Sequence, residues 1–227
     1  MPPRISIIIP TFNEAAIIER TLTALPQRED AERIVADGGS SDGTVDIAKK
    51  HADRVLITQP GRARQMNAGA HAAGGDILLF LHADSLLTKD ALHALSKAVE
   101  DPSVAGGAFR LAIDSPRRSL RMVAEAANWR TRLTGIPYGD QGIFVRRTVF
   151  ERLGGYPELP IMEDLEFSRR LKTVGRIARL PQPILTSSRR WNREGIGYTT
   201  LRNQVFVLLY FIGVSPARLA RWYRPVR

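Results

Sequence analysis

The 227-residue chain contains no cysteine and only 4 histidines. The lack of thiols excludes disulfides, thiolate metal sites and a cysteine nucleophile. There is also no GxGxxG turn and no GxxxxGK[ST] loop, and these absences argue against a Rossmann dinucleotide site and a P-loop nucleotide site. No apolar run reaches the ~20 residues that cross a bilayer. These absences leave an ordinary globular domain whose chemistry must rest on oxygen and nitrogen side chains.

Positive charge is present in excess and is unevenly distributed. The formal net charge is +10, and residues 189–227 contain eight arginines but one acidic residue, Glu194. Such a tail suits an anionic membrane surface, a phosphorylated substrate or nucleic acid, and it can equally be a solvated face. Without a nucleic-acid motif or interleaved aromatic residues, we expect no nucleic-acid partner. The N-terminus has no signal-peptide pattern, so a cytoplasmic location is expected.

Short apolar runs rich in β-branched residues alternate with helical segments. This alternation predicts an α/β domain with βαβ units and a mostly parallel sheet. We expect strands over residues 4–10, 33–37, 54–58, 77–81, 105–113, 138–146, 176–180 and 184–188. We expect helices over residues 15–25, 45–51, 61–73, 89–99, 116–133, 148–153, 162–174 and 197–212.

Polar clusters stand at the ends of four apolar segments: Asn13-Glu14, Asp37, His82-Ala83-Asp84 and Glu163-Asp164. Each cluster alone could be a helix cap, an Asx turn or a charge that complements a helix dipole. Parallel sheets bind ligands beyond the carboxyl ends of their strands, so the clusters are expected to converge there. Clustered carboxylates need a cation to coexist. With no cysteine and few histidines, Mg²⁺ or Mn²⁺ fits best.

Four motifs follow one another along the chain: SIIIPTFNE at 6–14, ADGGSSDGT at 36–44, HAD at 82–84, and GGY at 154–156 followed by ED at 163–164. Their order and spacing, over residues 4 to about 175, resemble those of family 2 glycosyltransferases of the GT-A fold. With GRARQMN at 61–67 and YGDQG at 138–142, the compact chain is also similar to a short bacterial subgroup labelled arsenosugar-biosynthesis glycosyltransferases.

This resemblance implies a central sheet flanked by helices and a division of the chain. Residues 1–190 would form the glycosyltransferase domain, with a nucleotide-sugar half over 1–100 and an acceptor half over 101–190. Residues 191–227 would add an apolar helix and a basic tail. The implied reaction is inverting, metal-dependent sugar transfer from a nucleoside diphosphate donor to an acceptor hydroxyl of a small molecule or a lipid-linked acceptor.

The resemblance also assigns the donor side. Asp37 would bind the base, commonly uracil in this family, and Asp84 would hold the metal that bridges the donor phosphates. His82 replaces the usual first acid of the DXD motif, so it would contact the ribose or ligate the metal. The full donor-binding set is Pro10, Thr11, Asn13, Glu14, Asp37, Gly38, Arg62, Arg64, His82, Ala83 and Asp84.

On the acceptor side, Asp164 matches the catalytic base of the family, which accepts the proton of the attacking hydroxyl. Glu163 is expected to be structural or to contact the acceptor. Asp140 and Gln141 lie in a polar break within an apolar segment and are expected to face substrate, with a turn as the alternative.

Residues 187–191 resemble the QxxRW segment of processive members, with serine in place of glutamine. Arg190 would grip the diphosphate, and Trp191 would form an apolar wall or pack in the core. The missing glutamine argues against a processive polymerase. A nucleotide-sugar-binding module without catalysis is the alternative function, and the intact Asp37, Asp84 and Asp164 argue against it.

The apolar segment 205–212 is too short to cross a bilayer. We expect it to pack on the sheet or on a second copy of the chain. The alternative is that it rests on an anionic membrane surface, with Arg202, Arg218, Arg221 and Arg224 around it.

Overall fold

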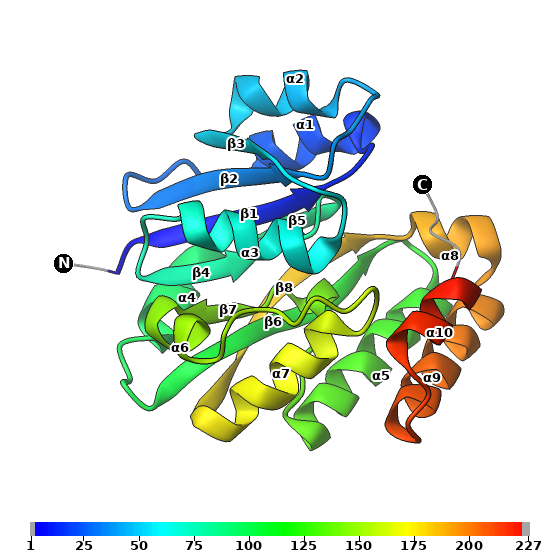
Figure 1. The fold of residues 1–227 in the computed structure, drawn as a ribbon. Helices are drawn as coiled ribbons and strands as arrows, with labels where there is room; N and C mark the ends of the chain where they lie inside the picture. Colours follow the sequence, from blue (N-terminus) through cyan, green and yellow to red (C-terminus); the bar gives the residue numbers. More distant parts are fainter. Residues whose placement is uncertain (1–2, 224–227) are drawn as a thin grey trace.

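The computed structural model describes residues 3–223 and contains one eight-stranded sheet in this part of the chain, in the order β3-β2-β1-β4-β7-β6-β8-β5 (Figure 1). The strands are β1 Ile5–Thr11, β2 Ala31–Asp37, β3 Arg54–Ile57, β4 Ile77–Phe80, β5 Ser85–Leu87, β6 Val104–Asp114, β7 Phe144–Arg146 and β8 Arg176–Ser187. β1 pairs in parallel with β2 and β4, β2 with β3, and β6 with β8. β7 and β5 pair antiparallel with their neighbours. The mostly parallel α/β sheet is therefore as expected.

Helices cover both faces of this sheet. Successive residues of a strand point to opposite faces, and Ile7 and Ile8 of β1 accordingly belong to two different apolar clusters. The helices are α1 Ala15–Ala24, α2 Thr44–His51, α3 Arg62–Ala72, α4 Ala91–Ala98, α5 Arg118–Thr134, the 3₁₀ turn η1 Gly139–Gln141, α6 Arg147–Arg152, α7 Glu163–Val174, α8 Arg189–Glu194, α9 Ile196–Phe211 and α10 Pro216–Trp222. Helix α4 contributes Leu92 to the first cluster. Helices α3 and α7 contribute Met66 and Phe167 to the second.

Several element boundaries differ from the sequence expectation. β8 is one strand, not two, because it pairs with β6 on both sides of residues 181–182. These two residues form a bulge opposite the step from Phe109 to Arg110 of β6. Proline has no N–H to donate to a ladder, which explains the bulge at Pro181. The expected strand over 138–146 is reduced to β7, since η1 occupies its polar start. The short elements β5, α8 and α10 had no clear periodicity in the sequence.

The topology places the candidate site. β1 lies between β2 and β4, so the strand order reverses beside β1, which is where open α/β sheets form their ligand crevice. The carboxyl ends of β1 and β2 pair Thr11 with Asp37, and the loop that follows β4 carries residues 81–84 to the same edge.

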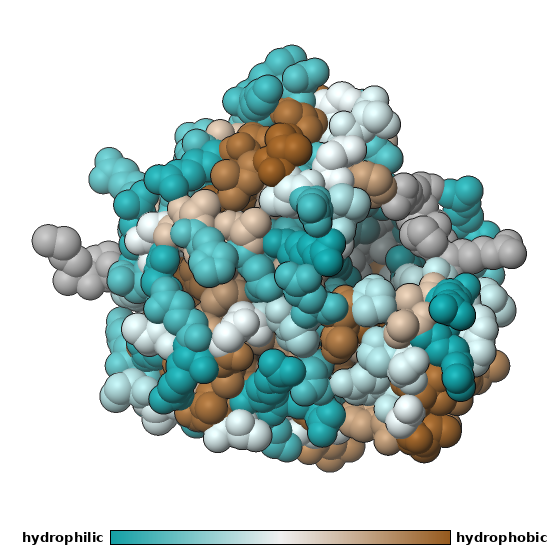
Figure 2. Space-filling view, in the orientation of Figure 1, coloured by the Kyte–Doolittle hydropathy of each residue, from teal (hydrophilic) through white to brown (hydrophobic). Residues whose placement is uncertain are grey.

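The sheet ends at Ser187, and the three helices α8, α9 and α10 follow at one side of the molecule (Figure 1). The division of the chain at residue 190 remains a prediction. None of the helices in residues 3–223 is both long and apolar enough to span a bilayer. Figure 2 shows apolar side chains gathered over the lower end of α9.

Candidate active site

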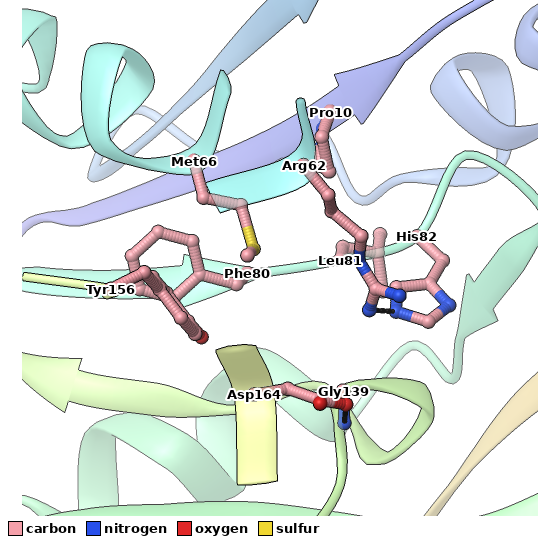
Figure 3. Close-up of a pocket in the computed structure, with 9 residues that line it drawn as sticks. All are labelled: Pro10, Arg62, Met66, Phe80, Leu81, His82, Gly139, Tyr156 and Asp164. Carbon is pink, nitrogen blue, oxygen red and sulfur yellow. Dashed lines mark hydrogen bonds between the residues drawn. The ribbon is translucent and has the colours of Figure 1, made fainter. Parts of the chain in front are cut away.

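A small pocket joins the two halves of the chain at the carboxyl edge of the sheet (Figure 3). Its walls come from β1, α3, β4 and the following loop, η1, the segment after α6, and the start of α7. The residues that line it are Pro10, Arg62, Met66, Phe80, Leu81, His82, Gly139, Tyr156 and Asp164. The structure thus brings donor-side and acceptor-side candidates, which are far apart in sequence, to one place.

The guanidinium group of Arg62 lies at the centre of this pocket. Its Nε is 3.3 Å from Oε1 of Glu163, and its Nη2 contacts Nε2 of His82. Figure 3 shows Arg62 reaching from the start of α3 to the His82 ring, with Asp164 and Gly139 opposite. Burial lowers the pKa of Arg62, but Glu163 and Asp164 outweigh it and raise the pKa above its usual value. Arg62 is therefore a permanent cation held between acids.

The first turn of α7 carries both predicted acids. The backbone N–H of Gly139 donates to Oδ2 of Asp164 at 2.7 Å, and that of Leu165 donates to Oδ1 at 2.8 Å. These bonds fix the carboxylate in one orientation. Glu163 is only 4% exposed, and burial, with a further contribution from Asp164 and against that of Arg62, raises its pKa to about 7.

Asp84 stands in the loop after β4. Burial raises its pKa, and the positive charges of Arg189, Arg62 and Arg190 oppose that rise. Arg189 also donates to Glu14, with Nη2 3.0 Å from Oε2. The charge of Asp84 in turn raises the pKa of Glu14, after the larger effect of burial. Asp84 and Glu14 are therefore neighbouring acids that share one arginine.

This donor set suits a hard cation that arrives with a diphosphate. No cluster of three or more histidine, aspartate or glutamate side chains within residues 3–223 could hold a metal by itself. Mg²⁺ is commonly bound by one or two carboxylates together with substrate phosphates and water, so Asp84 fits that role. The predicted ligand role of His82 meets an obstacle, because its Nε2 already accepts from Arg62. Burial and the charges of Arg62 and Arg190 lower the pKa of His82 well below its usual value, so the ring is neutral.

The nucleotide-side residues gather at the ends of β1 and β2. Asp37 is fully buried, and its carboxylate accepts from the N–H groups of Gly39 and Ser40 and from the hydroxyls of Thr11 and Ser40. Asp37 thus also holds the loop that carries Gly38. Asn13 adopts a left-handed backbone with φ 54°, and its Oδ1 accepts from the N–H of Ser41.

Two of the predicted donor residues, Arg64 and Ala83, have polar groups that bond to other parts of the protein. Arg64 does not line the pocket; its Nε donates to Oε2 of Glu158 at 2.9 Å and its Nη1 to Gln59. Ala83 is buried, and its carbonyl accepts from the hydroxyl of Thr21 at 2.6 Å. A donor contact from Arg64 would require this side chain to leave Glu158.

Asp140 and Gln141 of η1 have different surroundings. Oδ1 of Asp140 is buried without a hydrogen-bond partner, and burial raises its pKa against the opposing charge of Arg130. Gln141 is 2% exposed, and its Oε1 accepts from the hydroxyl of Thr131 and the N–H of Tyr138. Asp140 is thus the residue of η1 with an unmet polar atom, whereas Gln141 holds the turn.

Arg190 and Trp191, predicted to contact the diphosphate and the acceptor, lie in the first turn of α8. Burial and Arg202 lower the pKa of Arg190, and the guanidinium lies 5.0 Å from the ring centre of Tyr223. Trp191 is half-buried and packs against the main apolar cluster, while its Nε1 is buried without a partner. Both the wall and the packing interpretation of Trp191 remain compatible with this position.

Sequence reasoning missed Arg189 and Tyr156. Arg189 differs from the predicted Arg190 by one position, and nothing in the local pattern pairs it with Glu14. Tyr156 is 2% exposed and stacks on Phe167 with ring centres 4.3 Å apart, so it supports the floor of the pocket. Its place in the predicted GGY motif was the available signal.

Known proteins resemble this chain in sequence and in fold. The family model described as glycosyl transferase family 2 matches residues 6–154. A probable glycosyltransferase, YdaM of Bacillus subtilis, is 27% identical over 202 residues, which cover 76% of this chain and 47% of that protein. Validoxylamine A glucosyltransferase of Streptomyces hygroscopicus is 32% identical over 114 residues, which cover 45% of this chain and 27% of that protein. The chain spans about half the length of YdaM and less of validoxylamine A glucosyltransferase.

Among solved structures, a mannosyltransferase of Pyrobaculum calidifontis in complex with GDP-Man and Mn²⁺ is similar, with a TM-score of 0.65 and 25% identity. The match covers 97% of this chain and 69% of that one. The S. aureus protein TarS, at 20% identity and a TM-score of 0.64, shares the fold over 95% of this chain and 68% of that one. With the family model matching more than half of its residues, this chain belongs to glycosyl transferase family 2.

Proposed function

We propose that this glycosyltransferase moves a sugar from a nucleoside diphosphate donor to an acceptor hydroxyl, with inversion at the anomeric carbon and with help from a divalent cation. The observation that carries the proposal is that Asp84 lies close enough to Arg62 for their charges to interact, and that Arg62 shares one pocket with Asp164. Asp84 and Arg62 would serve the donor, and Asp164 would serve the acceptor.

Asp164 would act as the general base. An acceptor hydroxyl is a poor nucleophile until its proton can leave during the attack. The N–H groups of Gly139 and Leu165 hold the Asp164 carboxylate, so its orientation is set before substrate binds. Attack from the side opposite the leaving diphosphate inverts the anomeric centre.

Asp84 would hold the cation, with Glu14 nearby. A bound Mn²⁺ or Mg²⁺ would neutralise the charge that develops on the departing nucleoside diphosphate. Arg62, Arg189 and Arg190 would supply further positive charge to the phosphates. The Mn²⁺ held by the Pyrobaculum mannosyltransferase supports a divalent cation and does not select between the two metals.

For the donor base we propose uracil, bound near Asp37, with guanine as the alternative because the Pyrobaculum structure holds GDP-Man. Residues 10–14 and Gly38 would line the nucleotide, and His82 would contact the ribose. On the acceptor side, Asp140, Glu163 and Trp191 would approach the substrate. The cytoplasmic location expected from the sequence stays a prediction.

A donor screen tests this function. Release of UDP or GDP is measured from a panel of nucleotide sugars with Mn²⁺ or Mg²⁺, for the wild type and for Asp84→Ala. Asp90→Ala, an exposed acid at the start of α4, is the matched control. We expect Asp84→Ala to lose cation-dependent turnover and the control to keep it. Donor binding without turnover for any acceptor would instead favour a catalytically inactive binding module.

A further inference from the structure

Helix α9 exposes most of its large apolar side chains. Most surface helices of globular proteins turn an apolar stripe inward and present polar residues to water. In α9 the buried residues are Thr199 and Phe206, whereas the exposed side includes only one polar side chain, Gln204. The large exposed apolar residues, which we call the α9 face, are Tyr198, Leu201, Val205, Leu208, Phe211 and Ile212.

The spacing of the α9 face makes it one continuous surface. Tyr198, Leu201, Val205, Leu208 and Ile212 recur at alternating intervals of three and four residues, which puts them on one side of a helix, and Phe211 follows Leu208 by three residues. Leu201 is 67% exposed, Leu208 61% and Ile212 68%. Exposure of this extent in a contiguous stripe marks an interaction surface. The expectation that this segment packs on the sheet of its own chain is therefore not met.

One arginine lies beside this face, and two more are exposed on α10, the helix that contacts α9. Arg218 and Arg221 of α10 are exposed, and Arg169 of α7 lies 5.7 Å from the ring centre of Phe211. Arg202 was expected at the rim, but its side chain is 8% exposed and pairs with Glu194 at 2.8 Å. Arg224 lies outside the described residues. Since Glu194 is the one acid between 189 and 227, no carboxylate of α9 or α10 offsets Arg218 and Arg221.

Two partners could cover such a face, and charge separates them. A second copy would bring another chain with net charge +10 and its own arginines to the same place. A stable interface also needs about 800 Å² and 20–30 residues on each side, far more than one helix face supplies. An anionic bilayer instead attracts arginines at its surface and accepts apolar side chains below its headgroups. We propose that the α9 face docks on an anionic phospholipid surface.

The docked face is coupled to the active site. The hydroxyl of Tyr210 on α9 donates to Oε2 of Glu166 at 2.9 Å, two residues beyond Asp164 on α7. At the other side, Tyr223 packs on Phe206 and lies under Arg190. A bilayer at α9 would therefore lie beside α7, the helix that carries Asp164. On the proposed function, the acceptor hydroxyl then belongs to a lipid-anchored molecule.

Vesicle co-sedimentation tests the docking without any donor. The full chain is mixed with vesicles of phosphatidylglycerol and phosphatidylcholine, or of phosphatidylcholine alone. We expect binding to the anionic vesicles that weakens with salt, because exposed charges are screened. Leu201→Ser with Leu208→Ser should lower the partition coefficient by roughly tenfold or more. Ile57→Ser, an exposed isoleucine of β3, is the apolar control and should bind as the wild type does.

The contribution of positive charge to vesicle binding is tested with a second variant and its matched control. Arg218→Gln with Arg221→Gln should weaken binding by about fivefold for each arginine removed. Lys49→Gln with Lys50→Gln makes the same change in net charge on α2, at the other end of the molecule (Figure 1), and should have a much smaller effect. Circular dichroism of each variant confirms that the fold is kept.

Three outcomes would overturn the inference. These are no binding to anionic vesicles, equal loss in the Ile57→Ser control, and a dimer in solution that the Leu201→Ser, Leu208→Ser variant abolishes. Binding of UDP and GDP in the presence of Mn²⁺ and without vesicles is measured on the same samples. Protein that binds a nucleoside diphosphate but ignores vesicles would refute the docking alone, and protein that binds vesicles but neither nucleotide would refute the proposed function alone.

Discussion

The backbone N–H of Gly139 donates a 2.7 Å hydrogen bond to Oδ2 of Asp164 and thereby joins η1 to the first turn of α7. Gly139 sits so close to its neighbours that a Cβ there would contact Nη2 of Arg62 and Oδ2 of Asp164. A glycine at this position lets the backbone, rather than a side chain, orient the proposed base.

Gly139→Ala should therefore lower activity strongly while leaving the rest of the fold intact. The added methyl group forces Arg62 and Asp164 apart, and misplacement of a catalytic group by about 1 Å can cost ~100-fold in rate. The measurement is kcat with a saturating donor. Gly197→Ala is the control, because a Cβ at Gly197 meets no atom within 4 Å. Equal activity in the two variants would show that the Gly139 contact does not position Asp164.

Glu163 should make the stability of the protein fall as pH rises. Its pKa is about 7 in the folded chain against 4.5 ordinarily, so the folded state binds the proton more tightly. The resulting stabilisation is full below about pH 4.5 and is lost as pH rises through 7, by at most roughly 3 kcal/mol. Urea unfolding at pH 5 and pH 8 measures the difference. Glu163→Gln should reduce the difference, and Glu158→Gln, at an exposed acid, should leave it unchanged.

His82 should contact the donor rather than the cation. Its neutral ring accepts from Arg62 through Nε2, so this nitrogen is not available to a metal in the structure described. We expect His82→Asn to raise the KM for the donor and to leave the ratio of Mn²⁺- to Mg²⁺-supported activity unchanged. Asp84→Asn, in contrast, should raise the cation concentration that gives half-maximal activity. A change of metal preference in His82→Asn would assign the ring to the metal.

Asp37 should be as important for stability as for donor binding. Its carboxylate accepts four hydrogen bonds in a fully buried position, and an amide oxygen and nitrogen cannot accept them all. Asp37→Asn is expected to lower the free energy of unfolding by about 2–4 kcal/mol. Denaturant titration checks this, with Asp114→Asn, a half-exposed acid, as the control. A fully stable Asp37→Asn protein would contradict the structural role.

The sequence predicted the fold well where periodicity and motif agreed. β1 and β4 are largely apolar runs, and β1, β2 and β4 each end within about one or two residues of the expected position. The failures have physical causes. β5 has only three residues and owes its existence to pairing with β8, and the bulge at Pro181 in β8 depends on a register that no local pattern encodes.

The site was predicted less completely than the fold. Motifs predicted Asp84 after β4, Asp164 in the first turn of α7, and Arg62 or Arg64 in α3; Arg62 and Asp164 line the pocket, and the roles of these residues remain predictions. The contact of Arg62 with His82 and Glu163, and that of Arg189 with Glu14, join residues that only the folded chain brings together. Arg64 was predicted at the site but does not line it. It lies two residues beyond Arg62 on α3, on another side of the helix, and its side chain donates to Glu158.

The most direct test of the central claim compares Asp164→Asn with Asp46→Asn, which changes an acid in the first turn of α2. For each variant, kcat and the dissociation constant of the donor are measured under the same cation concentration. Loss of the general base should lower kcat by about 10²–10⁴-fold in Asp164→Asn, with donor affinity kept and with Asp46→Asn fully active. An Asp164→Asn enzyme that turns over at the wild-type rate would contradict the assignment of Asp164 as the base.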